Sequence, residues 1–218
     1  MSASKATIEA RGGAAKPGLS PWVRGLLITL LVFGGCAVLV VGSAVVFEYT
    51  AKELPLTAED RRVLVTADRL AELSQGFTHV ARHDNFRKRR LIDGSFEIEY
   101  EYDDEGDSAP YVLCTVDVEP SERDAREAYQ LAWGSLHLGA KFGNDELTIE
   151  ERNEVYKAGD ASRFGVVKVD GSPIGNLFVA RLGTKVLSLF VVGLWFDQGD
   201  EFKAVVGPAL AALKTYEP

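Results

Sequence analysis

The sequence predicts an α/β (α+β) protein in which one N-terminal transmembrane helix precedes a three-layer α/β/α domain with a mainly antiparallel sheet. Residues 25–47 form an uncharged run, and hairpin signals predominate beyond it. Residues 185–196 are apolar on both faces of an expected strand. A strand that is buried on both sides needs a covering layer on each side of the sheet, which gives the three layers.

The uncharged run Gly25–Phe47 comprises 23 residues without Asp, Glu, Lys, Arg, His, Asn, Gln or Pro. As a helix rising about 1.5 Å per residue it would reach roughly 35 Å, enough to cross a hydrocarbon core of about 30 Å. Trp22 and Tyr49 flank it, as aromatic residues do at membrane interfaces. We therefore expect a disordered tail over residues 1–21, a transmembrane helix over 22–49, a linker over 50–56 and a folded domain over 57–218.

Charges around the run predict its orientation. Lys5, Arg11, Lys16 and Arg24 precede it, against the single acid Glu9. Because positive charge is retained in the cytoplasm, we expect a single-pass protein of the cell membrane with a cytoplasmic N-terminus and an extracytoplasmic C-terminal domain.

Two cleaved alternatives remain open. A signal peptide could be cut at the small residues 42–44, although its apolar core would exceed the typical 7–15 residues. A lipoprotein signal could end before Cys36, although a bulky Phe33 suits that poorly and the apolar run continues for eleven residues beyond the cysteine. Both observations favour an uncleaved anchor.

Small residues recur on one side of the expected membrane helix. Gly35 and Gly42 are seven residues apart, close to two helical turns, and two further pairs of small residues share this spacing. Small side chains let a second helix approach closely in lipid. Replacing both glycines by leucine is therefore expected to abolish a membrane-dependent oligomer, and unchanged crosslinking would contradict this expectation.

Composition limits the function classes of the domain. Residues 54–218 carry 19 Lys and Arg against 29 Asp and Glu, a net charge of −10. Such a surface argues against nucleic-acid binding, because phosphate contacts need positive charge. Cys36 lies in the membrane run and Cys114 in an expected strand, so we expect no disulfide between them and a buried, apolar role for Cys114.

The first elements of the domain have clear end signals. Thr57 and Asp60 match a capping box that opens an expected helix over 57–74. Asp93-Gly94 is typical of a two-residue hairpin turn between strands that span 86–102. That turn places Glu97 opposite Arg90 and Glu99 opposite Lys88, so the basic run 87–90 is interpreted as a sheet-pairing device. A basic docking patch for lipid headgroups or an acidic partner is the alternative.

The remaining elements follow from turn residues and periodicity. The acidic stretch 103–110 is interpreted as a solvated turn, since its glycine and acids do not match a calcium loop. The expected elements are a strand over 111–118, a helix from Ser121 to Gly139, short strands near 147–150 and 154–158, strands over 164–170 and 176–182 around a loop at 171–175, a strand over 185–196, and a helix over 200–216 that contains Pro208.

The element order resembles a known family. The hairpin around 171–175, the apolar strand 186–196 and the terminal helix 202–213 look like the C-terminal half of the PsbP/Mog1-like fold. The resemblance covers residues 75–218, rests on element order alone and leaves the helix at 57–74 unaccounted for. Members of that family are mostly binding or assembly factors, so the resemblance implies such a role here.

The sequence contains no recognisable catalytic motif, and we predict no catalytic, cofactor-binding or metal-ligating residues. His79 and His83 would lie about 13 Å apart in an extended chain, too far to share a metal. The sequence therefore favours a non-enzymatic domain that binds or helps assemble a membrane or extracytoplasmic protein. The alternatives are a membrane-anchored hydrolase, or a small-ligand or lipid-binding module, with a site assembled from distant loops.

Overall fold

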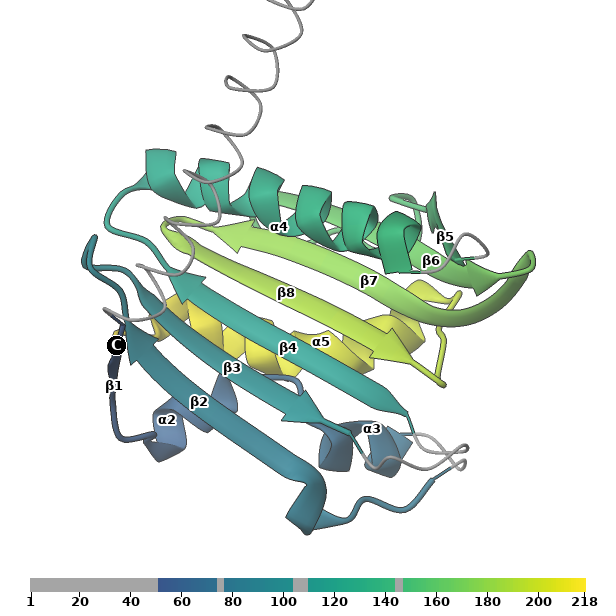
Figure 1. Ribbon diagram of the computed structural model, residues 1–218, viewed down its shortest axis with the longest axis horizontal. Helices are drawn as coiled ribbons and strands as arrows, with labels where there is room; N and C mark the ends of the chain where they lie inside the picture. The colour runs from purple at the N-terminus through teal and green to yellow at the C-terminus, as the bar shows by residue number, and fades with distance from the viewer. Residues whose placement is uncertain (1–50, 74–76, 104–109, 144–146) are drawn as a thin grey trace, which may run out of the picture. The chain divides into compact units, whose positions relative to one another are not determined.

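The structure, a computed structural model, describes residues 51–73, 77–103, 110–143 and 147–218, with only the backbone described over 136–143 (Figure 1). The expected tail and membrane helix, including Gly35 and Gly42, lie outside these residues, as do positions 104–109 of the acidic stretch. Within the described ranges, no helix combines the length and apolar character needed to cross a membrane.

The described residues belong to one compact unit built on an eight-stranded sheet, with strand order β1-β2-β3-β4-β8-β7-β6-β5. Every neighbouring pair of strands is antiparallel, which confirms the predicted sheet type. The strands are β1 (Lys52–Glu53), β2 (Asp84–Arg90), β3 (Phe96–Tyr102), β4 (Tyr111–Val118), β5 (Leu147–Glu151), β6 (Ala161–Val169), β7 (Ser172–Leu182) and β8 (Lys185–Val192). The helices are α2 (Ala58–Arg62), α3 (Ala67–Leu73), α4 (Glu122–Gly143) and α5 (Gly199–Thr215), with a 3-10 turn over Ala81–His83.

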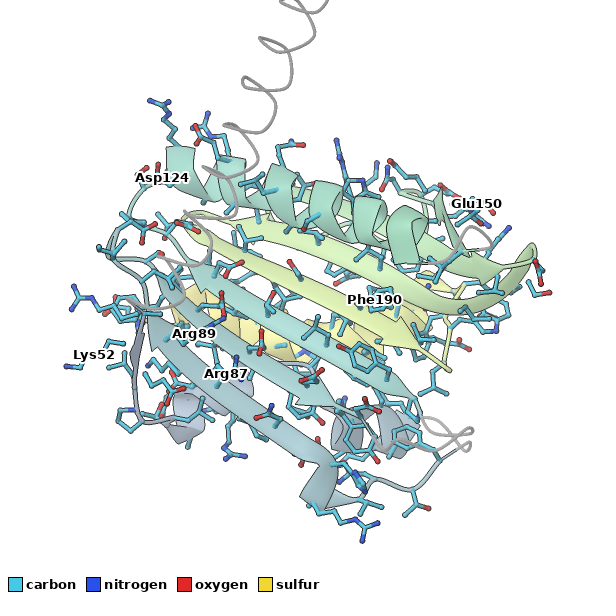
Figure 2. The ribbon with its side chains drawn as sticks, in the orientation of Figure 1. Lys52, Arg87, Arg89, Asp124, Glu150 and Phe190 are labelled. Carbon is cyan, nitrogen blue, oxygen red and sulfur yellow. The ribbon has the colours of Figure 1, made fainter. Side chains whose placement is uncertain are left out.

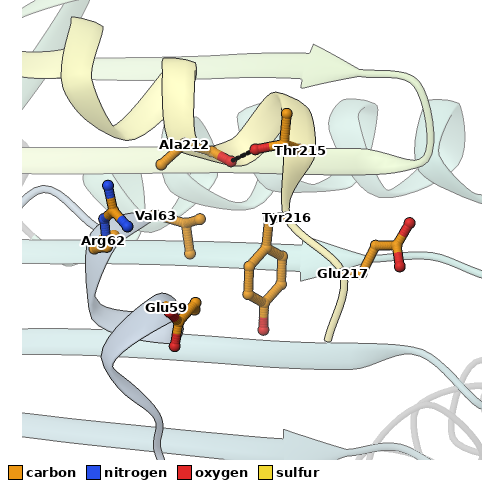
Figure 3. Close-up of a pocket in the computed structure, with 7 residues that line it drawn as sticks. All are labelled: Glu59, Arg62, Val63, Ala212, Thr215, Tyr216 and Glu217. Carbon is orange, nitrogen blue, oxygen red and sulfur yellow. Dashed lines mark hydrogen bonds between the residues drawn. The ribbon is translucent and has the colours of Figure 1, made fainter.

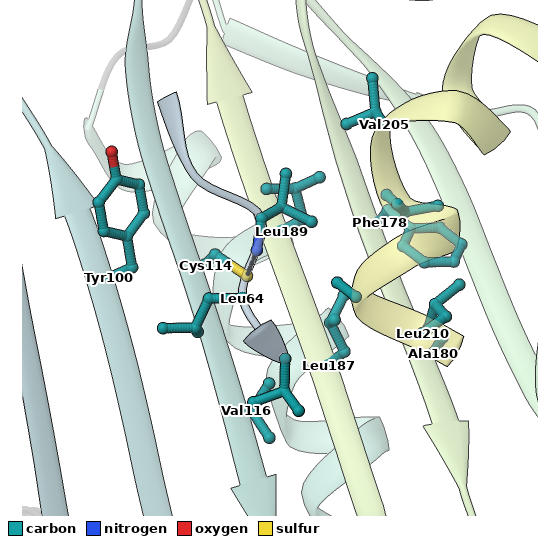
Figure 4. Packing of buried hydrophobic residues seen from close by; sticks show 14 of the residues in the cluster. Leu64, Tyr100, Cys114, Val116, Phe178, Ala180, Leu187, Leu189, Val205 and Leu210 are labelled. Carbon is teal, nitrogen blue, oxygen red and sulfur yellow. Dashed lines mark hydrogen bonds between the residues drawn. The ribbon is translucent and has the colours of Figure 1, made fainter. Parts of the chain in front are cut away.

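The helices cover the sheet unequally. Helices α2, α3 and α5 lie on one face, and α4 lies on the other, across the half formed by β5, β6, β7 and β8 (Figure 1). The main core fills the α5 side, where alternate residues of β3, β4 and β8 meet α5 (Figure 4). Phe202, Val206, Leu210 and Leu213 of α5 are buried there, as the sequence predicts.

Helix α4 has a smaller core of its own. Its buried residues Ala125, Tyr129 and Trp133 pack on β6, β7 and β8. Gly165 of β6 leaves room for the indole, since a Cβ there would lie 3.2 Å from Trp133 Cη2 and 2.7 Å from Ile149 Cγ2. On this face the strands β2, β3 and β4 are left without a helix over them among the described residues (Figure 1).

The predicted helix over 57–74 is wrong in one respect, because it is split into α2 and α3. Its capping box is present, with Asp60 N donating to Thr57 Oγ1 and Thr57 N to Asp60 Oδ2. The segment between the two helices buries Val63, Leu64 and Val65 in succession, and Val65 N donates to Cys114 Sγ. Consecutive side chains of a helix point about 100° apart, so a helix that packs on one side only does not bury three in a row. Tertiary burial therefore overrides the helical pattern here.

The hairpin register is shifted by one residue from the prediction. Leu91 N donates to Ser95 O across a three-residue loop that ends at Gly94, which has a φ of +92°. Glu97 therefore faces Arg89 and Glu99 faces Arg87. Because side chains alternate along a strand, this one-residue shift turns Lys88 to the opposite face of the sheet, into the protein.

Further boundaries differ from the prediction. Helix α4 continues past Gly139 to Gly143. Residues 154–158 form no strand, because the chain turns where Val155 N donates to Arg152 O. Strands β6 and β7 join through a two-residue turn at Asp170-Gly171, and both residues have a positive φ. The rest of the predicted loop belongs to β7, whose pairing with β6 shifts by one residue at a bulge between Val167 and Lys168.

Strand β8 ends at Val192 rather than at residue 196. Gly193 follows with a φ of +89°, which bends the chain away from the strand direction. The side chain of Asn176 then holds the departing segment, since its amide donates to Phe196 O and accepts from Phe196 N. The strand lies in the middle of the sheet order with both faces covered, as its two apolar faces predict.

Candidate functional site

The open half of the sheet presents a row of polar side chains beside α4. Along β3 and β4, even-numbered residues are buried in the main core, so the odd-numbered residues from Glu97 to Glu101 and from Tyr111 to Asp117 face the α4 side. The register aligns them in rows, with Glu97 next to Asp117 and Thr115 next to Ser188. Figure 2 views this face, on which Arg87, Arg89 and Phe190 are labelled.

A pocket of about 230 Å³ lies where this face meets α4. Its walls include Glu97, Thr115, Asp117, Ala132, Ser188 and Phe190. We call it the sheet–helix pocket. It is built from four elements, β3, β4, α4 and β8, which are distant in the sequence.

The carboxylates at this pocket are crowded. Burial raises the pKa of Asp117 to about 8, and the negative charges of Glu97, Glu119 and Glu99 act in the same direction, while Arg89 opposes them. Burial and the charge of Glu97 also raise the pKa of Glu99. The site is thus more negative than its environment readily supports.

The cations on this face are already engaged with glutamates. Arg89 Nε donates to Glu97 Oε1 at 3.1 Å, and Arg87 Nη1 lies 3.8 Å from Glu99 Oε1. These pairs confirm that the basic run 87–90 pairs across the sheet, although with different partners from those predicted. Asp117 has no comparable ion pair among the described residues.

Ser188 is the other unusual group in the sheet–helix pocket. Its side chain is only 6% exposed, and its Oγ has no hydrogen-bond partner among the described residues. It interrupts the apolar run Val186–Val192 of β8, between Leu187 and Leu189, which both face the main core. A buried hydroxyl without a partner is uncommon, because the lost hydration is not compensated.

A second, more open pocket of about 400 Å³ continues the acidic surface around the start of α4. Asp93, Glu119, Asp124 and Glu127 line it, together with Leu131, whose side chain is 71% exposed. Burial raises the pKa of Glu119, and Asp93 and Asp124 add to this. The negative charge of Glu119, in this pocket, also raises the pKa of Asp117, in the sheet–helix pocket, so the carboxylates of the two pockets repel one another. We therefore treat the two pockets as one negatively charged surface. We call it the acidic groove, defined by Asp93, Glu97, Asp117, Glu119, Asp124 and Glu127.

The two histidines considered in the sequence lie elsewhere, at the opposite end of β3. The extended chain assumed for them is wrong, because a 3-10 turn lies at Ala81–His83. Their rings both pack near Tyr102, with centroid distances of 5.6 Å for His79 and 6.1 Å for His83. In the described parts of the chain, no three His, Cys, Asp or Glu side chains are placed to hold a metal ion.

His79 belongs to a hydrogen-bonded chain that reaches α3. Its Nε2 lies 2.9 Å from Asp84 Oδ1, and the Tyr100 hydroxyl donates to the same carboxylate oxygen. Ala67 N donates in turn to the Tyr100 oxygen. Tyr100 is fully buried, and burial, above all, raises its pKa far above the ordinary range, so its hydroxyl stays protonated. This chain of contacts positions α3 and offers no free nucleophile.

Cys114 is a structural residue. It is fully buried, and its Sγ accepts a hydrogen bond from Val65 N (Figure 4). Burial raises the pKa of the thiol to about 12, so the reactive thiolate is not populated at neutral pH. The predicted role as a buried apolar side chain is confirmed.

A further pocket, of about 290 Å³, lies between α2 and the end of α5 (Figure 3). Glu59, Arg62 and Glu217 stand around it. Its most buried polar side chain, Tyr216, already donates its hydroxyl proton to Asp60. We interpret this pocket as a gap between two helices, because it contains no buried polar group in need of a partner.

Sequence reasoning missed Asp117 and Ser188. Each follows an alternating strand pattern, and only the pairing of β4 with β8 shows that the two residues line the same pocket. The one feature of the sequence that could have indicated the site is Ser188, a hydroxyl side chain within the apolar run of β8. No known family, curated protein or solved structure matches this chain.

Proposed function

We propose that this chain is a single-pass membrane-anchored protein without catalytic activity, whose extracytoplasmic domain binds a positively charged, partly apolar segment of a partner protein in the acidic groove. The observation that carries the proposal is the set of carboxylates that line the two pockets beside α4, because no lysine or arginine of the described residues contributes to either lining. Arg89 and Arg123 lie nearby but are paired with Glu97 and Glu127. A cation supplied from outside would relieve the mutual repulsion of these groups.

The rim of the groove adds apolar contacts to the charge. Leu131 of α4 is 71% exposed, and Ile92 of the hairpin loop, next to Asp93, is 65% exposed. Large exposed apolar side chains beside a charged surface are typical of protein interaction sites. A segment that carries both basic and apolar residues complements this surface better than a purely basic one.

The alternatives have less support. A hydrolase needs a base within hydrogen-bond reach of its nucleophile, and the Ser188 hydroxyl has no such partner among the described residues. A lipid-binding module needs a large apolar cavity, whereas the sheet–helix pocket has a volume of about 230 Å³ and contains carboxylates. Two larger pockets, of about 570 and 660 Å³, are each lined by several charged side chains. The resemblance to PsbP/Mog1-like proteins remains a prediction and agrees with a binding or assembly role.

Site-specific photocrosslinking tests this function. A benzophenone amino acid would replace Leu131 at the groove, or Lys203 on the exposed side of α5 as the matched control, in the full-length protein in native membranes. We expect a discrete protein adduct from position 131 only. Absence of an adduct at 131, or the same adduct from both positions, would contradict the proposal.

The charge dependence of the adduct provides a second test. The double substitution Glu119→Gln and Glu127→Gln is expected to reduce the adduct at position 131 severalfold, whereas Glu201→Gln on α5 is expected to leave it unchanged. Raising the ionic strength to 1 M shortens the screening length to about 3 Å and should act like the double substitution. An adduct that is insensitive to both changes would show that the carboxylates do not bind the partner.

A further inference from the structure

Two of the three hydroxyls that line the sheet–helix pocket lie next to each other on the sheet. Thr115 of β4 and Ser188 of β8 are register partners and lie on the same face of the sheet. Ser188 is 6% exposed, lines the pocket, and its Oγ has no hydrogen-bond partner in the described part of the chain. A ligand that donates a hydrogen bond would satisfy this group.

Asp117 supplies a negative charge at the same pocket. It lies two residues from Thr115 on β4, and so on the same face. The charged groups that act on it are Glu97 and Glu99 of β3, Glu119 beyond the end of β4, and Arg89 of β2. At the pocket itself, α4 and β8 contribute only uncharged side chains. Two carboxylates, Glu97 and Asp117, and the hydroxyls of Thr115, Ser135 and Ser188 therefore line the pocket. Glu97 is already paired with Arg89, and the Ser135 hydroxyl donates to Ala132 O, which leaves Asp117, Thr115 and Ser188 as the acceptors considered for a ligand.

The remaining walls suit a hydrocarbon stem. Leu113, Phe190 and Ala132 line the pocket, and its volume of about 230 Å³ lies below the 300–1,000 Å³ typical of drug-sized ligands. A single long side chain matches this space better than a cofactor. Carbon atoms of that side chain would pack on the aromatic ring and the aliphatic residues.

We propose that the sheet–helix pocket recognises the side-chain ammonium group of a lysine, held by the Asp117 carboxylate and the hydroxyls of Ser188 and Thr115. The inference rests on the proposed function, because the lysine would belong to the partner segment bound in the acidic groove. An ammonium group has three donors that can reach separate acceptors on two strands. A guanidinium group is a planar fork that favours bidentate contact with one carboxylate, so it fits these acceptors less well.

The test uses full-length protein in nanodiscs of phosphatidylcholine, whose headgroups do not compete as anionic lipids would. The probes are the N-acetyl methylamides of lysine, arginine and norleucine, titrated and followed by ligand-observed NMR. We expect saturable binding of the lysine derivative, at least tenfold weaker binding of the arginine derivative, and no binding of the norleucine derivative. Equal binding of the lysine and arginine derivatives would overturn the inference.

Two substitutions locate the site. Asp117→Asn and Ser188→Ala are each expected to weaken binding of the lysine derivative by at least fivefold. Asp170→Asn and Ser172→Ala, at the exposed β6–β7 turn, are the matched controls and should leave binding unchanged. Thermal unfolding of every variant shows whether the domain is intact. If both pocket variants fold and bind like the unchanged protein, the inference is wrong.

The pH dependence adds a readout that a structural role for Asp117 would not produce. Burial raises the pKa of Asp117 to about 8, and only its ionised form attracts the ammonium group, whose own pKa is about 10.4. Affinity should therefore rise about tenfold between pH 7 and pH 9. Asp117→Asn should abolish this rise, and a flat profile for the unchanged protein would contradict the inference.

The outcomes separate this inference from the proposed function. If the lysine derivative fails to bind but the adduct at position 131 is retained, the groove binds a partner without a lysine in the pocket. If the lysine derivative binds but the adduct is absent, the pocket is an ammonium site and the proposed partner segment is wrong.

Discussion

Replacing Lys88 by methionine is expected to lower the free energy of unfolding by about 3–5 kcal/mol. The Lys88 ammonium donates to Asp60 Oδ1 at 2.9 Å, and the two side chains are 8% and 1% exposed. The Tyr216 hydroxyl donates to the same carboxylate oxygen. Without the ammonium group, Asp60 would remain buried with a negative charge and no cation beside it. Urea unfolding followed by tryptophan fluorescence measures the loss.

Matched variants distinguish the pair from a general effect of losing a lysine. Lys157→Met, at an exposed position, should change the free energy of unfolding by less than about 0.5 kcal/mol. The double variant with Asp60→Asn and Lys88→Met removes both charges and should recover most of the loss, since a neutral amide needs no counter-ion. A double variant no more stable than Lys88→Met would contradict this explanation.

Acid should destabilise the same interaction. Burial acts to raise the pKa of Asp60, but hydrogen bonds from Tyr216, Thr57 and Lys88 outweigh burial and hold the pKa below its ordinary value of 3.8. A carboxyl group with a lowered native pKa stabilises the fold fully above its unfolded pKa. This contribution is therefore expected to persist at neutral pH and to be lost as the pH falls below about 3.8. The double variant should lack this part of the acid sensitivity.

Replacing Phe202 by alanine is expected to destabilise the domain by about 3–5 kcal/mol. Phe202 is fully buried, and its ring lies 4.8 Å from that of Phe164 and 5.2 Å from that of Phe178, both edge to face. The ring centroids of Tyr156 and Phe196 lie 5.5 and 6.1 Å from that of Phe202. The substitution would leave a cavity where α5 meets β6 and β7, because Phe164 and Phe178 are held by these two strands and Tyr156 and Phe196 by separate loops.

The conservative variant calibrates this prediction. Phe202→Leu retains most of the volume and should cost less than about 1.5 kcal/mol. Leu131→Ala, at a position 71% exposed, should change stability little. Thermal and urea unfolding of the three variants measures the order of their losses in stability. A loss for Phe202→Ala no larger than that for Phe202→Leu would show that the core collapses around the missing ring.

Local patterns predict much of this fold because several strands have unambiguous faces. The alternation in β3 and β4 identifies their buried sides, and the two apolar faces of β8 place it in the centre of the sheet. The capping residues Thr57 and Ser121 mark the starts of α2 and α4. In each of these cases, local chemistry and tertiary packing favour the same structure.

The remaining features depend on contacts that the sequence order does not reveal. The motif Asp93-Gly94 is compatible with a two-residue or a three-residue hairpin loop, and the difference decides whether Lys88 faces solvent or Asp60. The break between α2 and α3 follows from burial against Cys114 and Tyr100. The candidate site combines residues of three strands and one helix that are distant in the sequence, so no spacing between residues in the sequence predicts it.

The two edges of the sheet have a consequence for self-association. At one edge of the described sheet lies β1, in which the structure places Lys52 and Glu53, and both side chains are exposed. At the other edge, β5 ends with Glu150 and Glu151, and Lys168 of the neighbouring strand forms an ion pair with Glu150. Short or charged edges resist the addition of a further strand from another molecule. An antiparallel sheet of this width is thus protected against growing into fibrils, even when many copies are crowded together.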